Sequence, residues 1–392
     1  MYVHPSELKL VQWEPTSLCN ANCIGCPRTD HDTMLTHPFI VKTQRHTTND
    51  EIQSFIDSIA DPRLEKLETV MFNGEIGDAM MHPDIDKIII EILKARPNIN
   101  VEIHTNGGGA WVRKFKKICE YASNNNSKVY IVFSVDGLED TNHLYRRNVI
   151  WKNIVKNAKV LSQYNVSKIW RWCTFDHNKH QVQEAKQLAE DWNFDFVLNN
   201  GVWGQEMVTK YKGKKSNSKL YKEKLNQYPT RTFIEDIPDS QYTTTSVVDL
   251  LNNKKDIKSD VCVWQYKKEV QIVSDMTVWP CCWTAHYQYY YKQNDERIWD
   301  SKWKYYKSPE LRGDRALTDL REWEELFNAN SNESYYEKKD IRISKNFLLY
   351  DVLISNTFVS IGNTLKTDNT FNLNICKTQC RKSPNAQLSK EN

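Results

Sequence analysis

The stretch EPTSLCNANCIGCPR, residues 14–28, decides the fold assignment because it places three cysteines on one short loop. Cys19, Cys23 and Cys26 have the spacing C-x3-C-x2-C, directly after a segment (8–14) whose alternation predicts a strand. Sulfur ligands favour zinc, copper(I) or iron–sulfur clusters. A structural zinc site usually has four ligands, and no fourth cysteine is nearby. The spacing therefore favours a cluster with one open iron, and a zinc knuckle or a set of redox thiols is the alternative.

The residues after this loop alternate between strand-like and helix-like patterns. The predicted helices cover 48–60, 84–96, 111–122, 150–164 and 180–192, and the predicted strands cover 68–73, 100–109, 128–137, 168–175 and 194–199. Such alternation predicts a parallel sheet covered by helices, either an incomplete (β/α) barrel or a doubly wound sheet. In both folds the functional site forms at the carboxyl ends of the strands.

With this cysteine spacing after the first strand, the chain resembles the radical S-adenosylmethionine (radical SAM) enzymes. The resemblance implies a [4Fe-4S] cluster bound by Cys19, Cys23 and Cys26, whose open iron chelates the amino and carboxylate groups of SAM. It implies that one electron from the cluster cleaves a C–S bond of SAM, and that the resulting 5′-deoxyadenosyl radical abstracts hydrogen from a substrate. The implied α/β fold is a partial (β/α)6 barrel, a partial TIM barrel, which agrees with the alternation.

The segment FNGEIGDAMMHPD, residues 72–84, resembles the family's Gly-Gly-Glu-Pro motif. Glu75 takes the position of the glutamate that holds the SAM amino group, although Asn73 and Ile76 replace the first glycine and the proline. A helix-capping or solvated carboxylate is the alternative for Glu75. Gly25 stands where many relatives carry an aromatic residue against the adenine, so adenine packing is expected to come from elsewhere.

Polar residues also follow the later strands, in HTNGG (104–108) and FSVDGLEDTNHLYR (133–146). The resemblance implies that Asn106, Ser134 and Asp136 approach SAM. It also makes Arg171, on the fifth strand, a candidate for meeting the SAM carboxylate. For Asp136 and the glycine after it, ordinary turn chemistry is the alternative.

Five further cysteines lie beyond the alternating region, and they are Cys262, Cys281, Cys282, Cys376 and Cys380. VSDMTVWPCCW (273–283) resembles the strand–turn–strand start of the SPASM and twitch extensions of radical SAM enzymes, with Met276 at the usual turn glycine. CKTQC (376–380) resembles their closing cysteine pair.

The resemblance implies that this region binds one auxiliary [4Fe-4S] cluster, as in the twitch type. The expected ligands are Cys262, Cys281, Cys376 and Cys380. Adjacent residues of an extended segment point to opposite faces, so only one of Cys281 and Cys282 is expected to bind. A structural zinc site with four cysteines is the alternative.

The predicted domains are a radical SAM partial barrel (1–204), a polar connector (205–258) and a small α+β auxiliary-cluster module (259–392). The 392 residues include 53 basic and 50 acidic side chains, and the net charge of +3 is too small to indicate a nucleic-acid partner. No apolar run is long enough to span a membrane, and the first residues lack the pattern of a signal peptide. A cytoplasmic location is therefore expected.

The function predicted is that of an enzyme, and a peptide or protein side chain is the first expectation for its substrate. A sugar or a nucleoside is the alternative substrate. A different class of function, a non-catalytic zinc protein that binds RNA or a protein partner, is disfavoured by the near-neutral charge. A reductant such as flavodoxin or ferredoxin is the expected partner. No residue in the sequence identifies itself as a substrate base or a radical-quenching thiol.

Overall fold

The computed structural model describes residues 3–24, 26, 28–29, 35–36, 38–74, 76–198, 268–280 and 339–360. Within these stretches, no helix combines the length and the apolar character that crossing a membrane requires.

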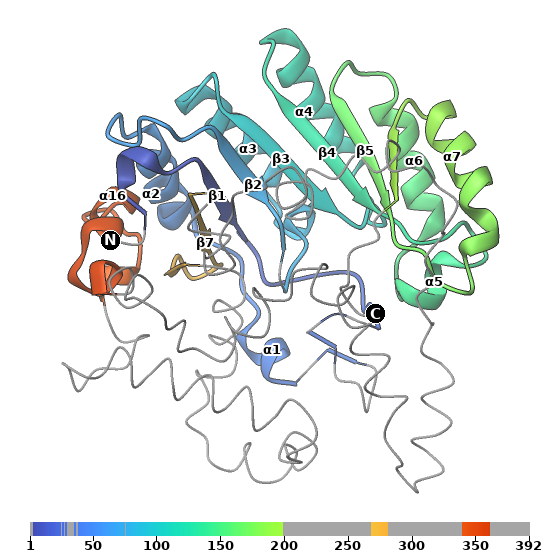
Figure 1. Ribbon diagram of the computed structural model, residues 1–392, viewed down its shortest axis with the longest axis horizontal. Helices are drawn as coiled ribbons and strands as arrows, with labels where there is room; N and C mark the ends of the chain where they lie inside the picture. Colours follow the sequence, from blue (N-terminus) through green and yellow to red (C-terminus); the bar gives the residue numbers. More distant parts are fainter. Residues whose placement is uncertain are drawn as a thin grey trace, which may run out of the picture. The chain divides into compact units, whose positions relative to one another are not determined.

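An open, mostly parallel sheet organises the described residues (Figure 1). Its strands are β1 (Leu10–Trp13), β2 (Thr69–Phe72), β3 (Asn100–Thr105), β4 (Val129–Ser134), β5 (Ser167–Trp172), β6 (Asp195–Leu198), β7 (Glu269–Ile272) and β8 (Val278–Trp279). Their order in the sheet is β6-β5-β4-β3-β2-β1-β7-β8. Among the described strands the sheet stays open, with β6 and β8 at its edges. The predicted α/β fold class, an incomplete barrel with parallel strands, is confirmed.

Helices follow the strands as the alternation predicted. The longer helices are α2 (Asn49–Ala60), α3 (Ile85–Ala95), α4 (Val112–Asn124), α6 (Trp151–Leu161) and α7 (Val182–Asp191). Short helices that the sequence did not indicate are α1 (Pro38–Thr43), α5 (Asn142–Tyr145) and α16 (Leu349–Ile354). Single 3-10 turns are η1 (Pro5–Glu7), η2 (Ala79–Met81), η3 (Lys179–Gln181) and η6 (Lys339–Ile341).

The chain divides into two compact units, which we describe separately. The central unit comprises Glu14–His46 and Val70–Val248, and the terminal unit comprises Met1–Trp13, Thr47–Thr69 and Asp249–Asn392. The predicted connector and most of the predicted auxiliary module lie outside the described residues. The linear boundaries at 204 and 258 therefore remain predictions.

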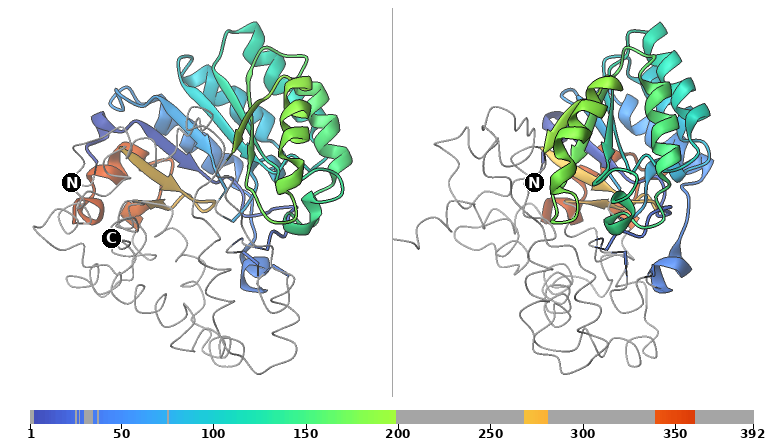
Figure 2. Two further views of the ribbon diagram at one scale, coloured as in Figure 1. Left: turned by 45° about the vertical axis from the view of Figure 1, so that its right-hand side comes forward. Right: turned by 90° about the vertical axis from the view of Figure 1, so that its right-hand side faces the viewer.

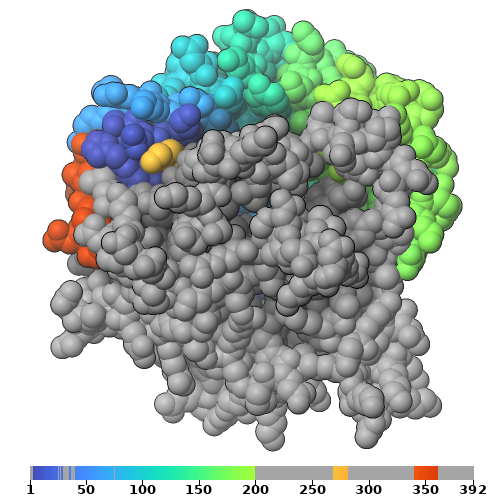
Figure 3. Space-filling model, viewed as in Figure 1, coloured from blue at the N-terminus to red at the C-terminus, as the bar shows by residue number. Residues whose placement is uncertain are grey.

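In the central unit, α3, α4 and α6 lie side by side along one face of the sheet and form a continuous surface from blue to green (Figures 1 and 3). The strand residues that face these helices are mostly apolar, and the rings of Phe115 on α4 and Phe133 on β4 are 5.9 Å apart. The opposite strand face is more polar. There, His104 Nε2 lies 2.5 Å from Glu102 Oε1 on the same strand, and Tyr130 pairs with Glu102 in register.

In the terminal unit, β7 pairs with β1 in parallel and with β8 in an antiparallel hairpin. A strand–turn–strand is therefore present at 269–279, and it overlaps the first part of the segment 273–283 that the resemblance pointed to. Met276 has a φ of 67°, the left-handed conformation that favours glycine, at the position where the resemblance expected a glycine. Ile343 donates its backbone N–H to Met276 O at 3.1 Å, which brings 268–280 and 339–360 side by side (Figure 2).

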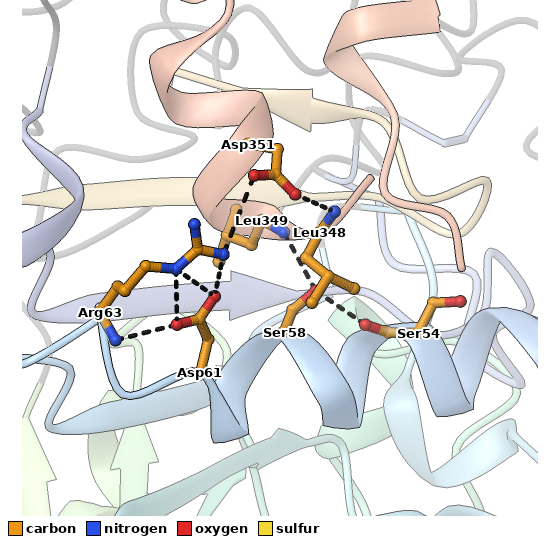
Figure 4. A network of polar contacts seen from close by, with 7 residues as sticks. All are labelled: Ser54, Ser58, Asp61, Arg63, Leu348, Leu349 and Asp351. Atoms are coloured by element: carbon orange, nitrogen blue, oxygen red, sulfur yellow. Dashed lines mark hydrogen bonds and ion pairs between the residues drawn. The ribbon is translucent and has the colours of Figure 1, made fainter. Parts of the chain in front are cut away.

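A polar network connects α16 to α2 within the terminal unit (Figure 4). The backbone N–H of Leu349 donates to Ser58 Oγ at 3.1 Å, and this hydroxyl in turn donates to Ser54 O at 2.7 Å. Arg63 pairs with Asp61 at 2.6 Å and lies 3.9 Å from Asp351. The network holds residues 349–351 against a helix that lies near the other end of the sequence.

Candidate functional site

The cysteine loop begins at the carboxyl end of β1, and Glu14 anchors it to the segment that follows β2. Glu14 is buried, and its Oε1 accepts the backbone N–H of Ile76 at 2.7 Å and that of Gly77. A Cβ on Gly77 would lie only 1.9 Å from the backbone oxygen of Thr16. Only glycine therefore allows the segment after β2 to pack this closely on the loop.

Arg28, at the other end of the loop, reaches the same segment. Its buried guanidinium donates from Nη1 to Ile76 O at 2.5 Å and to Ser17 O at 3.4 Å. The loop is therefore fixed at both ends, by a carboxylate and by a guanidinium. The sequence analysis missed both residues, because each is an ordinary charged side chain that flanks the motif.

Cys19 lies beside a buried amide network at the end of β3. Asn106 Nδ2 lies 3.9 Å from Cys19 Sγ, and it donates to Asn20 Oδ1 at 2.8 Å and to Asp78 Oδ2 at 2.7 Å. Asp78 also accepts the hydroxyl of Thr105 at 2.9 Å and the backbone N–H of Asn106 at 2.9 Å. Asn106, which we expected at the site, therefore does lie beside the first cysteine, and the unpredicted Asp78 holds it there.

Cys23 lies beside a buried ion pair. Arg146 Nη1 is 4.0 Å from Cys23 Sγ, and Arg146 Nε donates to Asp136 Oδ2 at 2.7 Å. The other carboxylate oxygen of Asp136 accepts the backbone N–H of Cys173 at 2.6 Å. Both oxygens of Asp136 therefore have partners within the protein, and its expected approach to SAM stays a prediction.

The electrostatics of the site follow from this burial. Burial raises the pKa of the Cys19 and Cys23 thiols, although the Arg146 guanidinium opposes the shift at Cys23. Burial also raises the pKa of Asp78. For Arg146, burial acts to lower the pKa, but the charges of Asp136 and Cys23 outweigh it and the net shift is upward. The guanidinium therefore stays charged beside the thiol.

Cys26 completes the loop through backbone contacts. Its N–H donates to Cys23 O at 3.1 Å, and Thr29 donates its hydroxyl to the same oxygen at 2.9 Å. Cys19, Cys23 and Cys26 are half-buried. Their donor set fits an iron–sulfur cluster, since three soft sulfur ligands are available on one loop with hydrogen-bond donors beside two of them.

Among the described residues, no three histidine, cysteine, aspartate or glutamate side chains form a group suited to a single metal ion. A cubane has a different requirement, because each of its cysteine ligands binds a different iron atom. The finding is therefore compatible with a cluster at the three cysteines.

Ser134 and Arg171 lie opposite each other in the β4–β5 register, so their side chains project from the same strand face near the carboxyl ends. Both are half-exposed. Glu75 lies outside the described residues, and so do all five predicted C-terminal cysteines, namely Cys262, Cys281, Cys282, Cys376 and Cys380. Their roles remain predictions.

Comparison with known families shows a similarity that lies mostly in the central unit. Residues 13–189 match the model of the Radical SAM superfamily, which is less than half of the chain. The matched stretch is similar to this superfamily. It runs from Trp13, the last residue of β1, into α7, and it includes the cysteine loop and the strand ends described above. The similarity supports an enzyme, and the superfamily implies SAM and a [4Fe-4S] cluster as cofactors and the use of a substrate and a reductant.

Two solved structures are distantly similar to the chain. Streptococcus suis SuiB bound to S-adenosylmethionine is 14% identical, with a TM-score of 0.42, over 78% of this chain and 67% of SuiB. BtrN in complex with AdoMet and 2-DOIA is 11% identical, with a TM-score of 0.35, over 75% of this chain and 83% of BtrN. No curated protein matches the sequence significantly. The similarity to the radical SAM superfamily lies in residues 13–189.

Proposed function

We propose that this chain is a radical SAM enzyme that acts on a peptide or protein side chain. The observation that carries the proposal is the C-x3-C-x2-C loop, which lies at the carboxyl end of β1 within the stretch that is similar to the radical SAM superfamily. When bound, the [4Fe-4S] cluster and SAM supply the one-electron chemistry that yields a 5′-deoxyadenosyl radical able to abstract hydrogen from a substrate.

The residues of the chain bind and orient these groups. Cys19, Cys23 and Cys26 are the proposed cluster ligands. Glu14 and Arg28 fix the two ends of the loop on the segment after β2, so these ends are positioned before any cofactor binds. This pre-organisation reduces the ordering that cofactor binding must otherwise impose on the loop.

The proposed SAM contacts lie at the ends of neighbouring strands. Asn106 reaches toward Cys19 from the end of β3, while Ser134 and Arg171 offer a hydroxyl and a guanidinium on one face of β4 and β5. A guanidinium is suited to a carboxylate, because it can form two parallel hydrogen bonds. Glu75 is retained as the proposed partner of the SAM amino group. Asp136 is retained as a proposed SAM contact, and its carboxylate, which has partners within the protein, is also proposed to support the site through Arg146.

The substrate proposal is supported by the resemblance of 273–283 to SPASM and twitch extensions, whose relatives commonly modify peptides. The left-handed Met276 in the β7–β8 turn is compatible with that resemblance. The polar strand face that carries Glu102 and His104 also suits a polar substrate. We further propose an auxiliary [4Fe-4S] cluster in the C-terminal region and flavodoxin or ferredoxin as the electron donor.

The first test is the iron and acid-labile sulfide content after anaerobic reconstitution. We expect about eight irons per chain, falling to about four when Cys19, Cys23 and Cys26 are all replaced by alanine. Cys119→Ala is the matched control, since this cysteine is buried in α4 and should not change the iron content. Stoichiometric zinc with little iron would contradict the proposal that the chain is a radical SAM enzyme.

The second test addresses the reaction and the substrate class. The reconstituted protein with SAM and dithionite should release 5′-deoxyadenosine, and the triple cysteine variant should not. A peptide mixture should raise this release above the substrate-free rate, whereas a panel of sugars and nucleosides should not. Stimulation by the sugars or nucleosides alone would replace the peptide proposal with the small-molecule one.

A further inference from the structure

We propose that Asp136 and Arg146 form a positioning pair that fixes a positive charge beside the Cys23 thiolate and raises the reduction potential of the cluster bound there. The inference rests on the proposed function, because it takes Cys23 as a cluster ligand. It adds a role for two residues that neither contact the substrate nor bind iron.

The backbone brings Arg146 to this position. Asn22 donates its N–H to Arg147 O at 2.9 Å, and Ile24 donates its N–H to Tyr145 O at 3.2 Å. These two bonds lie on either side of Cys23 and on either side of Arg146. The two residues are therefore held next to each other by the main chain, independently of their side chains.

The side chain of Arg146 has little freedom to leave. Its exposed fraction is 17%, and that of Asp136 is 1%. Asp136 is itself held by the backbone N–H of Cys173 at 2.6 Å and by its own N–H, which donates to Asn142 Oδ1 at 3.0 Å. Asp136 follows the end of β4, its carboxylate contacts the backbone just after β5, and it orients the guanidinium from there.

The order of the charges determines the expected electrostatic effect. Arg146 contacts Asp136 through Nε and Cys23 through Nη1, so the guanidinium lies between the carboxylate and the thiol. Reduction adds an electron to a cluster whose thiolate ligands are already negative. A nearby positive charge stabilises the reduced form more than the oxidised form, and burial makes this interaction stronger than it is in water. Cys19 serves as the internal contrast, because the donor beside it is the neutral amide of Asn106.

The test is an EPR-monitored redox titration of the full-length reconstituted protein. The signal followed is the one that changes when SAM is added, since that signal belongs to the SAM-binding cluster. In Arg146→Gln we expect the reduction potential of this cluster to be lower than in the wild-type protein. The equilibrium constant for its one-electron reduction should fall about tenfold, which corresponds to a shift of about 59 mV. Arg146→Lys keeps the charge and should restore most of the shift.

Asp136→Asn distinguishes an electrostatic effect on the reduction potential from a purely structural role of Asp136. It removes the negative charge but keeps an oxygen that can accept from Arg146, so the potential should rise above that of the wild-type protein. Opposite shifts in Arg146→Gln and Asp136→Asn support the pair, whereas a purely structural role would shift both variants in the same direction. Unchanged potentials with intact iron content would overturn the inference and leave the proposed function standing.

Two further outcomes remain decisive. If Arg146→Gln fails to take up iron, the inference is tested by Asp136→Asn alone. A reduction potential of Asp136→Asn at or below the wild-type value then overturns the inference. If the wild-type protein takes up no iron, the proposed function fails, and the inference fails with it.

Discussion

The thiols of Cys19 and Cys23 lie on one loop, yet their surroundings differ in charge. Asp78 holds the neutral amide of Asn106 beside Cys19, and Asp136 holds the cationic Arg146 beside Cys23. In both places a buried carboxylate orients a hydrogen-bond donor toward a thiol. The comparison shows that the effect of removing the carboxylate on stability depends on its partner. Removing Asp78 leaves neutral donors without this acceptor, whereas removing Asp136 leaves Arg146 as an unpaired buried cation.

The largest effect is expected for Asp136→Ala. Removing the carboxylate leaves Arg146 charged, largely buried and without its ionic partner, which should lower the free energy of unfolding by about 3–5 kcal/mol. Urea denaturation of the cluster-free protein measures this change.

The control for this prediction is the double variant Asp136→Ala/Arg146→Leu. Removing both charges should recover much of the stability, because replacing a whole buried pair with apolar side chains costs far less than breaking it. A double variant no more stable than Asp136→Ala would contradict the ionic explanation.

A smaller effect is expected for Asp78→Ala. The variant removes an acceptor of the Thr105 hydroxyl and the Asn106 amides, but the carboxylate that it removes accepts these bonds from neutral groups. The free energy of unfolding should fall by about 1–3 kcal/mol. Urea denaturation under the same conditions measures this change. If the unfolding free energy of Asp78→Ala falls as much as that of Asp136→Ala, the charge of the partner does not explain the difference between the surroundings of Cys19 and Cys23.

The smallest effect is expected for Ser58→Ala in the terminal unit, outside the cysteine loop. The variant leaves the buried N–H of Leu349 without its partner, which should cost about 1 kcal/mol in unfolding free energy. Iron content and reduction potential should stay at the wild-type values. A change in either would show that the effects at Cys19 and Cys23 are not local to the loop.

Much of the fold was predictable because it depends on local periodicity. The alternating pattern of β3 and the amphipathic pattern of α4 each identify an element without its neighbours. The hairpin at 269–279 was recognisable for the same reason. Its parallel pairing with β1 was not, because a strand pattern gives no indication of which distant edge the strand will join.

The candidate site was predictable only where a motif marks it. The cysteine spacing pointed to the loop, and Asn106 follows a strand that the pattern had identified. Arg146 gave no such signal, since it contacts a residue 123 positions earlier in the sequence. Asp78 and Glu14 were missed for a related reason: their importance comes from burial and from the backbone groups that they accept, neither of which a single sequence reveals.

The contact between α2 and α16 has a consequence for how the chain is synthesised. Leu349 and Ser58 are separated by 291 positions, whereas the strands β3 to β6 pair with their nearest neighbours in sequence. The central unit can therefore begin to fold on the ribosome while α16, a partner of α2, has not yet been made. At about 5–20 residues per second, α16 is made tens of seconds after α2. During that interval Ser58 lacks the N–H of Leu349, whereas Phe55 of α2 can already stack on Trp13.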